Sequence, residues 1–209
     1  MLRHIGGTES PFAHWANQKK QLKKSNEMNR LALALAVTGA LALWIPSVPA
    51  IAAIESEEAR EAASDAAAIA RHDMLEAFGE QSLKPGQYRW RNVAGDGEPR
   101  VIISLGDQLA FLYRGSTLVA VSTISSGKPG KDTPTGVFPI LEKKRMHRSI
   151  KYENAPMPFM QRIDQFGIAL HAGRLPGHPA SHGCVRLPGE FAAKLFSVTD
   201  VGTPVLIGA

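Results

Sequence analysis

The chain has 209 residues, of which 44% are hydrophobic and 21% are charged, and these are ordinary values for a globular protein. They exclude a disordered chain, a fibre and a membrane protein with many spans, and the length suits one domain of ordinary size with appendages. The formal net charge of +5 divides unevenly. Residues 1–30 hold six Lys or Arg against two acidic residues, residues 51–98 five against ten, and residues 99–209 thirteen against seven. Because the excess has separate causes, it does not indicate nucleic-acid binding.

The first predicted element, residues 1–50, is a basic cytoplasmic start followed by a signal peptide or anchor. Its basic stretch runs into residues 31–45, which carry no charge, and this is the pattern of an export signal. Cleavage near Ala50 or Ala52 is expected. The alternative is an uncleaved anchor, because the apolar segment reaches 23 residues when it is read through to Ala53. In either case we expect the remainder outside the cytoplasm, in the periplasm or cell envelope, with membrane contact only through an uncleaved leader.

Residues 51–98 form an acidic, Ala-rich segment that predicts a helix or linker. Its large apolar side chains are few and badly spaced, so we expect a solvated helix or spacer more than part of a core. The turn residues from Gly95 to Pro99 mark a domain boundary near residue 99.

Residues 99–209 are predicted to form the main folded domain. One helix is expected at residues 190–196, among short runs of β-branched and aromatic residues that are typical of strands. These runs are residues 101–105, 109–113, 118–124, 137–141, 168–170, 185–187 and 204–207. The pattern predicts a mainly β sandwich or barrel with one or two short helices, preceded by the leader and the helical or flexible segment.

Cys184 is the only cysteine, so it cannot form a disulfide within the chain. In an exported protein a free thiol needs a reason, although a small buried cysteine is the ordinary alternative. Three of the seven histidines, His171, His178 and His182, lie within thirteen residues upstream of it. Imidazole is the usual group that takes a proton from a nucleophilic thiol. The neighbourhood therefore favours a reactive cysteine.

The sequence around Cys184 resembles the L,D-transpeptidase catalytic domain family, of the YkuD type. Residues 181–186 read Ser-His-Gly-Cys-Val-Arg, preceded by the isolated His171, and this is the family's motif. Two further stretches are similar to the family: residues 126–138, which include Thr-Pro-Thr-Gly-Val-Phe, and residues 155–159, Ala-Pro-Met-Pro-Phe. The resemblance covers roughly residues 99–208.

The resemblance implies a cysteine acyltransferase. Cys184 would attack, and His171 would take its proton or pair with the thiolate. His182, Gly183 and Ser181 would shape the site, with backbone N–H groups around Gly183 and Cys184 as oxyanion donors. No cofactor is implied.

A loop between predicted strands, residues 143–160, combines a charge run with apolar residues. The resemblance makes this loop a lid over the cysteine, with Tyr152, Met157 and Phe159 contacting substrate. Closure of a lid would exclude water and favour attack by an amine. An ordinary long surface loop is the alternative reading.

The implied donor is a peptidoglycan tetrapeptide stem, cut before its terminal D-Ala. The acceptor would be the side-chain amine of another stem, giving a 3→3 cross-link, or a lipoprotein lysine. Water in place of the amine would give an L,D-carboxypeptidase instead. Arg186 could hold a substrate carboxylate or a structural acid such as Glu190.

Two other classes of protein remain as rivals. His171, His178, His182 and Cys184 have the ligand types of a zinc site. A non-catalytic wall-binding module would keep the fold, but it would be expected to lack Cys184 or His171, and both are present.

Overall fold

The computed structural model describes residues 55–79, 82–93 and 95–209. The predicted leader and its cleavage positions lie outside these residues. Among the helices that the structure does describe, none has the length and apolar character needed to cross a membrane.

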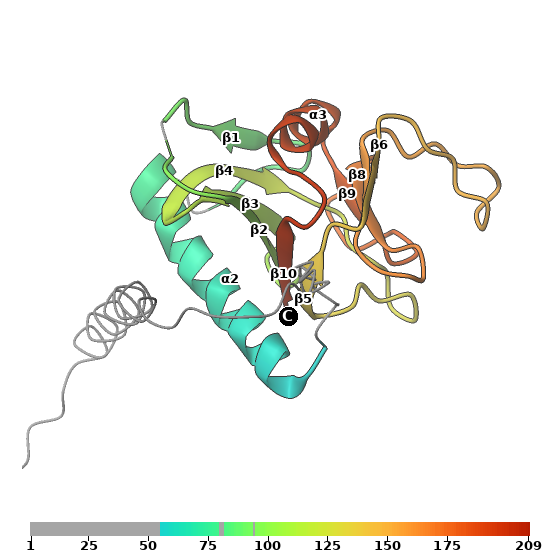
Figure 1. The fold of residues 1–209 in the computed structure, drawn as a ribbon, viewed down its shortest axis with the longest axis horizontal. Helices are drawn as coiled ribbons and strands as arrows, with labels where there is room; N and C mark the ends of the chain where they lie inside the picture. Colours follow the sequence, from blue (N-terminus) through green and yellow to red (C-terminus); the bar gives the residue numbers. More distant parts are fainter. Residues whose placement is uncertain (1–54, 80–81, 94) are drawn as a thin grey trace, which may run out of the picture. The chain divides into compact units, whose positions relative to one another are not determined.

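The described residues form two helices and ten strands (Figure 1). Along the chain the elements are α2 (Glu57–Phe78), β1 (Tyr88–Trp90), β2 (Pro99–Ser104), β3 (Leu109–Arg114), β4 (Thr117–Thr123), β5 (Gly136–Pro139), β6 (Glu142–Lys144), β7 (Met160–Arg162), β8 (Ala169–Ala172), β9 (Val185–Leu187), α3 (Gly189–Val198) and β10 (Pro204–Gly208). One sheet has six strands in the order β1-β4-β3-β2-β10-β5, and the other has four in the order β6-β7-β8-β9. The expected mainly β architecture is confirmed.

The six-stranded sheet is covered on both faces. Side chains alternate along a strand, so Val101 and Ile103 of β2 join one apolar cluster while Ile102 between them joins another. In β3 the same alternation places Leu112 in the first cluster and Phe111 in the second. Continuous apolar runs in these strands therefore reflect burial on both sides.

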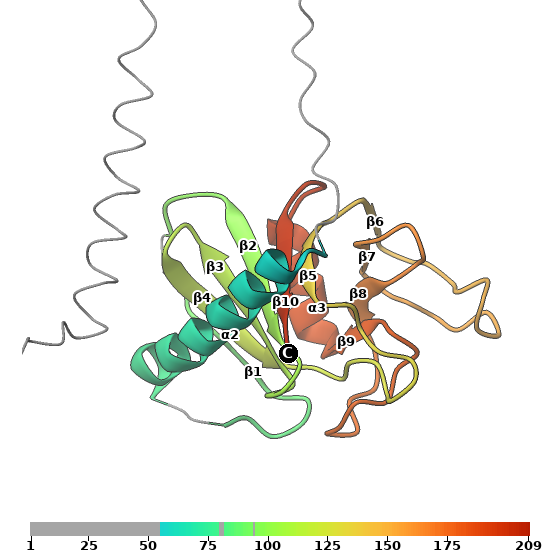
Figure 2. The ribbon, with the colours of Figure 1, turned by 90° about the horizontal axis from the view of Figure 1, so that it is seen from below.

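Helix α2 covers one of these faces, and the expectation of a solvated helix or spacer is wrong. Its buried residues recur at helical spacing and are mostly small: Ala59, Ala63, Ala67, Ala70 and Met74. Figures 1 and 2 show that the helix runs across this sheet. The small alanine side chains let its backbone approach the strands closely. A Cβ at Gly208 of β10 would lie only 2.7 Å from the Ala63 carbonyl oxygen. The helix packs through close approach instead of large side chains.

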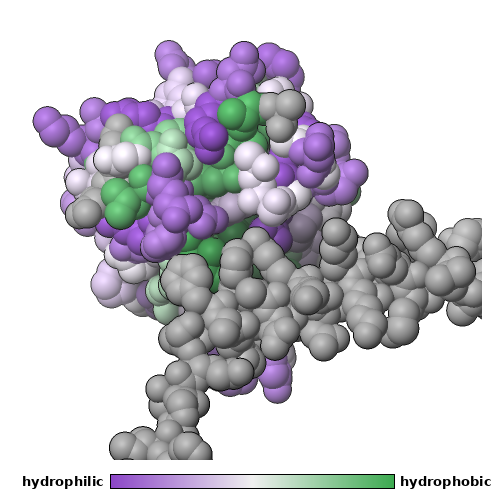
Figure 3. Space-filling view, turned by 90° about the vertical axis from the view of Figure 1, so that its left-hand side faces the viewer, coloured by the Kyte–Doolittle hydropathy of each residue, from purple (hydrophilic) through white to green (hydrophobic). Residues whose placement is uncertain are grey.

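The outer side of α2 is mixed in character. Ile69 and Leu75 are exposed large apolar residues, but most of the exposed helix positions are polar or charged. Figure 3 looks from the left-hand side of Figure 1, where hydrophilic residues are interspersed with smaller hydrophobic areas.

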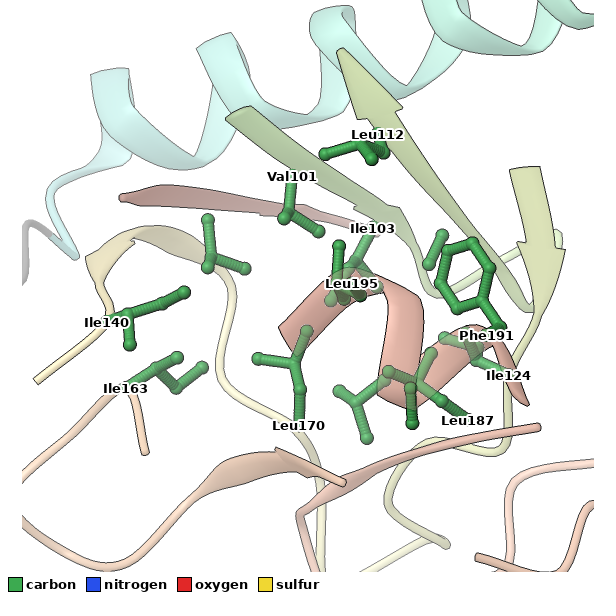
Figure 4. Packing of buried hydrophobic residues seen from close by; sticks show 14 of the residues in the cluster. Val101, Ile103, Leu112, Ile124, Ile140, Ile163, Leu170, Leu187, Phe191 and Leu195 are labelled. Atoms are coloured by element: carbon green, nitrogen blue, oxygen red, sulfur yellow. The ribbon is translucent and has the colours of Figure 1, made fainter. Parts of the chain in front are cut away.

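Helix α3 lies on the opposite face of the six-stranded sheet, between that sheet and the second one (Figure 4). Phe191, Ala192 and Leu195 are fully buried there. Leu170 of β8 and Val185 of β9 belong to the same cluster and are also fully buried. This packing anchors the two strands that carry the motif residues.

Several elements differ from the sequence expectations. Strand β1 pairs antiparallel with β4, although it precedes the expected boundary near residue 99. Strands β6 and β7 flank the expected lid loop and were not predicted. The helix expected at residues 190–196 lies within α3.

Candidate active site

Cys184 and His171 are held by two adjacent parallel strands. His171 lies in β8 and pairs in register with Arg186 of β9, while Leu170 pairs with Val185. Cys184 comes directly before β9, so the loop that ends at the strand presents it. Because both strands are anchored in the core, the thiol and the imidazole are carried on rigid elements.

The loop that precedes Cys184 is fixed by its own side chains. Ser181 Oγ donates to the Cys184 carbonyl oxygen (2.5 Å) and accepts from the Gly183 N–H (3.0 Å). Gly183 has φ of +113°, and a Cβ there would lie 2.6 Å from Ile168 Cδ1. The Ser181 hydroxyl and the glycine at position 183 therefore fix the conformation of this loop.

The Gly183 N–H does not match its expected role as an oxyanion donor, because it is already bonded to Ser181 Oγ. Within the described residues, the Cys184 backbone N–H has no hydrogen-bond partner. This amide is therefore free to face a developing negative charge.

Thr133 ties a second loop to the motif, a role that the sequence analysis did not find. Its buried hydroxyl donates to the Gly183 carbonyl oxygen (2.8 Å) and accepts from the Gly127 N–H (2.9 Å). A Cβ at Gly127 would lie 2.0 Å from the Lys131 carbonyl oxygen. The Thr-Pro-Thr-Gly stretch had been noted as a resemblance, but nothing in a single sequence says which loop it holds.

A cavity of about 1260 Å³ opens at this site. It brings together all of the site residues predicted from the sequence except Gly183 and Phe159, namely His171, Ser181, Cys184, Arg186, His182, Tyr152 and Met157. The expectation for Phe159 is not supported, since Phe159 packs against the core and its ring lies 6.0 Å from that of Phe196. The Arg145 guanidinium carbon also lies over the Phe159 ring, 5.9 Å from its centroid.

The environment of His171 favours its neutral form. Burial lowers the pKa of His171, and the positive charges of Arg186 and His147 lower it further, while the hydrogen bond to Ala172 opposes them. That bond joins Nδ1 to the Ala172 carbonyl oxygen at 2.8 Å. A carbonyl oxygen can only accept, so Nδ1 carries the proton and Nε2 keeps a free lone pair.

Cys184 is also held in its neutral form. Burial raises the pKa of the thiol, and the Asp164 carboxylate raises it further, whereas hydrogen bonding to the Ala169 backbone and the Arg186 charge lower it. The thiol donates a long hydrogen bond to the Gly167 carbonyl oxygen, with 3.7 Å between sulfur and oxygen. The resting pair is therefore a thiol and a neutral imidazole.

Arg186 lines the cavity without an acidic partner among the described residues. The alternative partner Glu190 instead accepts a hydrogen bond from the Tyr88 hydroxyl at 2.9 Å. The Arg186 stem lies against Gly173, where a Cβ would meet its side-chain carbons at 3.0–3.2 Å. Its guanidinium is thus available to an anionic ligand.

The loop between β6 and β7 reaches the motif through an aromatic contact. Residues 145–159 extend outward in both views (Figures 1 and 2), held by backbone bonds such as Met157 N–H to the His147 carbonyl oxygen at 2.8 Å. Tyr152 of this loop stacks on His182, with 4.6 Å between ring centroids. The loop therefore borders the cavity next to Cys184.

The zinc alternative finds no geometric support. No three of His171, His178, His182 and Cys184 place their ligand atoms within 4.8 Å of one another in the described part of the chain. His178 is exposed, and its backbone carbonyl oxygen accepts from the Ser125 hydroxyl.

Comparison with known proteins identifies the family. The sequence model of the YkuD family, described as the L,D-transpeptidase catalytic domain, matches residues 98–207, which is more than half of the chain. The chain therefore belongs to the L,D-transpeptidase catalytic domain family.

Individual relatives agree with this assignment. The chain is 30% identical over 131 residues to the probable L,D-transpeptidase YbiS of Escherichia coli K12, a match that covers 50% of this chain and 43% of that protein. It thus spans less than half of the length of the curated relatives it matches.

Solved structures show the same fold. An L,D-transpeptidase from Mycobacterium smegmatis matches with a TM-score of 0.50 and 20% identity over 54% of this chain and 59% of that one. An L,D-transpeptidase from Stackebrandtia nassauensis matches with a TM-score of 0.50 and 23% identity over 65% and 64%.

Proposed function

We propose that this protein is a peptidoglycan L,D-transpeptidase in which Cys184 is the nucleophile and His171 is the base. The observation that carries the proposal is that both side chains line one cavity, His171 from β8 and Cys184 from the position directly before the adjacent strand β9, with Nδ1 of His171 fixed by Ala172. That arrangement leaves Nε2 as the proton acceptor. Family membership agrees with this reaction class.

Acylation begins from the neutral pair. As the Cys184 sulfur attacks the carbonyl carbon before the terminal D-Ala of a stem peptide, the thiol proton moves to Nε2 of His171. The tetrahedral oxyanion is stabilised by the free Cys184 N–H. When the C–N bond breaks, His171 returns its proton to the leaving D-Ala amine, and a thioester remains on Cys184.

Arg186 supplies the carboxylate recognition in this scheme. Its guanidinium has no acidic partner among the described residues. Arg186 pairs in register with His171 and lines the same cavity as Cys184, and its charge lowers the pKa of each. Stem peptides carry several carboxylates, which a guanidinium binds with paired hydrogen bonds. The excess positive charge of residues 99–209 favours the approach of such a substrate.

Transfer requires an amine to reach the thioester. His171 deprotonates the incoming amine, the amine attacks the thioester carbonyl, and the thiol is restored. The loop of residues 145–159 acts as a lid in this step, and the stacking of Tyr152 on His182 supports that role. Exclusion of water by the lid favours transfer over hydrolysis.

The proposal includes export of the catalytic domain to the periplasm or cell envelope. Its support is the leader pattern of residues 1–50 alone, together with the location of peptidoglycan. A lipoprotein lysine is the alternative acceptor.

The deciding experiment incubates the full-length protein with purified tetrapeptide stems and follows the products by mass spectrometry. A 3→3 dimer with release of D-Ala is the expected product. If trimmed tripeptide were the only product, the protein would be a carboxypeptidase. No conversion, with a folded protein in the tube, would contradict the proposed activity.

The pH profile of kcat/KM should reflect the lowered pKa of His171. A base accepts a proton only when it is neutral, so activity is kept above that pKa and is lost as the pH falls through it. The acidic limb is therefore expected below about 6.5, the ordinary histidine value. Arg186→Gln removes one of the charges that lower this pKa and should move the limb to higher pH.

Arg174→Gln is the matched control for this shift, because Arg174 lines the same cavity but is not among the groups that perturb the pKa of His171. If the acidic limb of the kcat/KM profile lay at the same pH in the wild type and in Arg186→Gln, the electrostatic argument would be contradicted.

Carbapenem-type β-lactams should acylate Cys184. Their strained amide offers the same carbonyl to the nucleophile that a stem peptide offers. Intact-mass measurement should show one adduct per chain, located on the single cysteine. An active enzyme that gains no mass would show that the pocket does not admit this class of inhibitor.

A further inference from the structure

The turn between β7 and β8, residues 163–168, is organised by one buried carboxylate. Asp164 is 6% exposed, and its Oδ1 accepts from the backbone N–H groups of Phe166 (2.9 Å) and Ile168 (2.8 Å). The Ile163 N–H closes the turn on the Ile168 carbonyl oxygen at 2.9 Å. Loss of this carboxylate oxygen would leave two backbone donors without a partner.

The same turn contacts the nucleophile and its loop. Gly167 presents the carbonyl oxygen to which the Cys184 thiol donates, at 3.7 Å. Ile168 occupies the space beside Gly183, where a Cβ would lie 2.6 Å from its Cδ1. The position of the Asp164 turn therefore sets the position of the resting sulfur.

Asp164 also brings an uncompensated negative charge to this place. Its carboxylate forms no ion pair with a described residue. The nearest arginine in sequence, Arg162, donates to the Asp164 backbone carbonyl oxygen (2.8 Å) and directs its Nε to Glu142 (3.0 Å). Burial is the largest cause that raises the pKa of Cys184, and the Asp164 charge raises it further, because a negative charge disfavours the thiolate.

Other ionisable groups lie around the same cavity as the sulfur. The Arg186 charge favours the thiolate and is the opposing influence. The ionisable residues that line the cavity, besides Cys184, are Glu142, His147, Lys151, Tyr152, Glu153, Arg162, His171, Arg174, His182 and Arg186. Among the groups that perturb the pKa of Cys184, Asp164 is the acidic one.

We propose that Asp164 is a positioning residue that keeps the resting Cys184 a neutral thiol directed at the Gly167 carbonyl. Only a protonated sulfur can donate to that oxygen, so the turn and the charge favour the same state. Thiols are oxidised according to their thiolate character and exposure. In an exported enzyme, a thiol that ionises only when His171 takes its proton during attack is protected between turnovers. The protective role of Asp164 rests on the proposed function, whereas the contacts of the Asp164 turn with Cys184 do not depend on it.

The test measures the alkylation of Cys184 by iodoacetamide across pH in the full-length protein, read by intact mass. Asp164→Asn keeps an oxygen that can accept from Phe166 and Ile168 and removes only the charge. We expect its alkylation midpoint at lower pH than in the wild type. At neutral pH the rate should rise about three-fold for each unit that the thiol pKa falls, because thiolate increases while its nucleophilicity declines.

Asp132→Asn is the matched control. Asp132 is exposed, and its backbone carbonyl oxygen lies 3.6 Å from a Cβ placed at Gly183. The substitution Asp132→Asn therefore removes an equal charge beside the same loop. We expect its alkylation profile to equal that of the wild type. An Asp164→Asn profile that coincides with the control overturns the proposal.

A second variant guards against loss of folding. Asp164→Ser retains a short acceptor without charge, and thermal unfolding of each variant identifies any that is not folded. A lowered midpoint in folded Asp164→Asn supports the proposal. Asp164→Ser takes its place only if Asp164→Asn is not folded, and an unchanged midpoint in the folded variant that is used overturns the proposal. The stem-peptide assay is separate: an enzyme that cross-links without the alkylation shift refutes only this inference, whereas a shift without cross-linking refutes only the proposed activity.

Discussion

Replacement of Cys184 by alanine is expected to abolish cross-linking and hydrolysis of stem peptides. The chain holds no other thiol that could form the thioester, and without a nucleophile only binding and oxyanion contacts remain. Removal of a covalent nucleophile can cost about 10⁶-fold in kcat. Product formation measured by mass spectrometry should fall below detection.

The loss should come from chemistry and not from unfolding. Cys184 is half-buried against Met157, Met160 and Ala169, so deletion of its sulfur removes a modest contact. We expect the free energy of unfolding to fall by about 1 kcal/mol. Cys184→Ser, which keeps the volume, should be equally inactive and closer to the wild type in thermal unfolding. Retained cross-linking by folded Cys184→Ala would overturn the cysteine mechanism.

The sequence could predict the motif but not all of its contacts. Residues 181–186 were sufficient to name the family and the cysteine, because the motif is local. The use of the Gly183 N–H by Ser181 was not predicted, since one hydroxyl can bond with any of several nearby backbone groups. Asp164 gave no signal at all. An aspartate before Gln-Phe-Gly reads as an ordinary turn until the fold places that turn beside Cys184.

The fold was predictable where large apolar residues alternate and not where small residues pack. Strands β2, β3 and β4 were expected because their β-branched and aromatic runs stand out. Helix α2 was expected as a helix but assigned to solvent, since an apolar stripe of alanines has little hydrophobic contrast. The helix packs closely against Gly208, which is more than 100 residues away in the sequence, so a local pattern could not reveal this contact.

The partner of Arg186 was also beyond prediction from the sequence. Two partners were open from the sequence, a substrate carboxylate and Glu190. In the structure Glu190 accepts a hydrogen bond from Tyr88, which lies on a strand that had not been predicted. Without β1 in place, the spacing of Arg186 and Glu190 alone could not exclude an ion pair.

Replacements of the two motif histidines are expected to have different effects on the reaction. His171→Gln removes the proposed base, which in our scheme accepts the thiol proton and later deprotonates the acceptor amine, so acylation and transfer should both slow by about 10²–10⁴-fold. Intact-mass kinetics with a β-lactam measure acylation, and dimer formation measures the complete reaction. Alkylation of Cys184 at neutral pH should slow as well, because neutral His171 is the acceptor for its proton.

His182→Gln is the matched comparison, because His182 lies two residues from Cys184 but directs its exposed ring to Tyr152 of the lid loop. Loss of that stacking is worth about 1 kcal/mol, so a rate change within about ten-fold is expected, mainly in transfer to the amine. The Nδ1 bond from His171 to Ala172 is what separates the two residues, since it leaves Nε2 of His171 ready to accept a proton. If His171→Gln kept near wild-type acylation while His182→Gln eliminated it, the base would be His182 and the fixed tautomer of His171 would be structural.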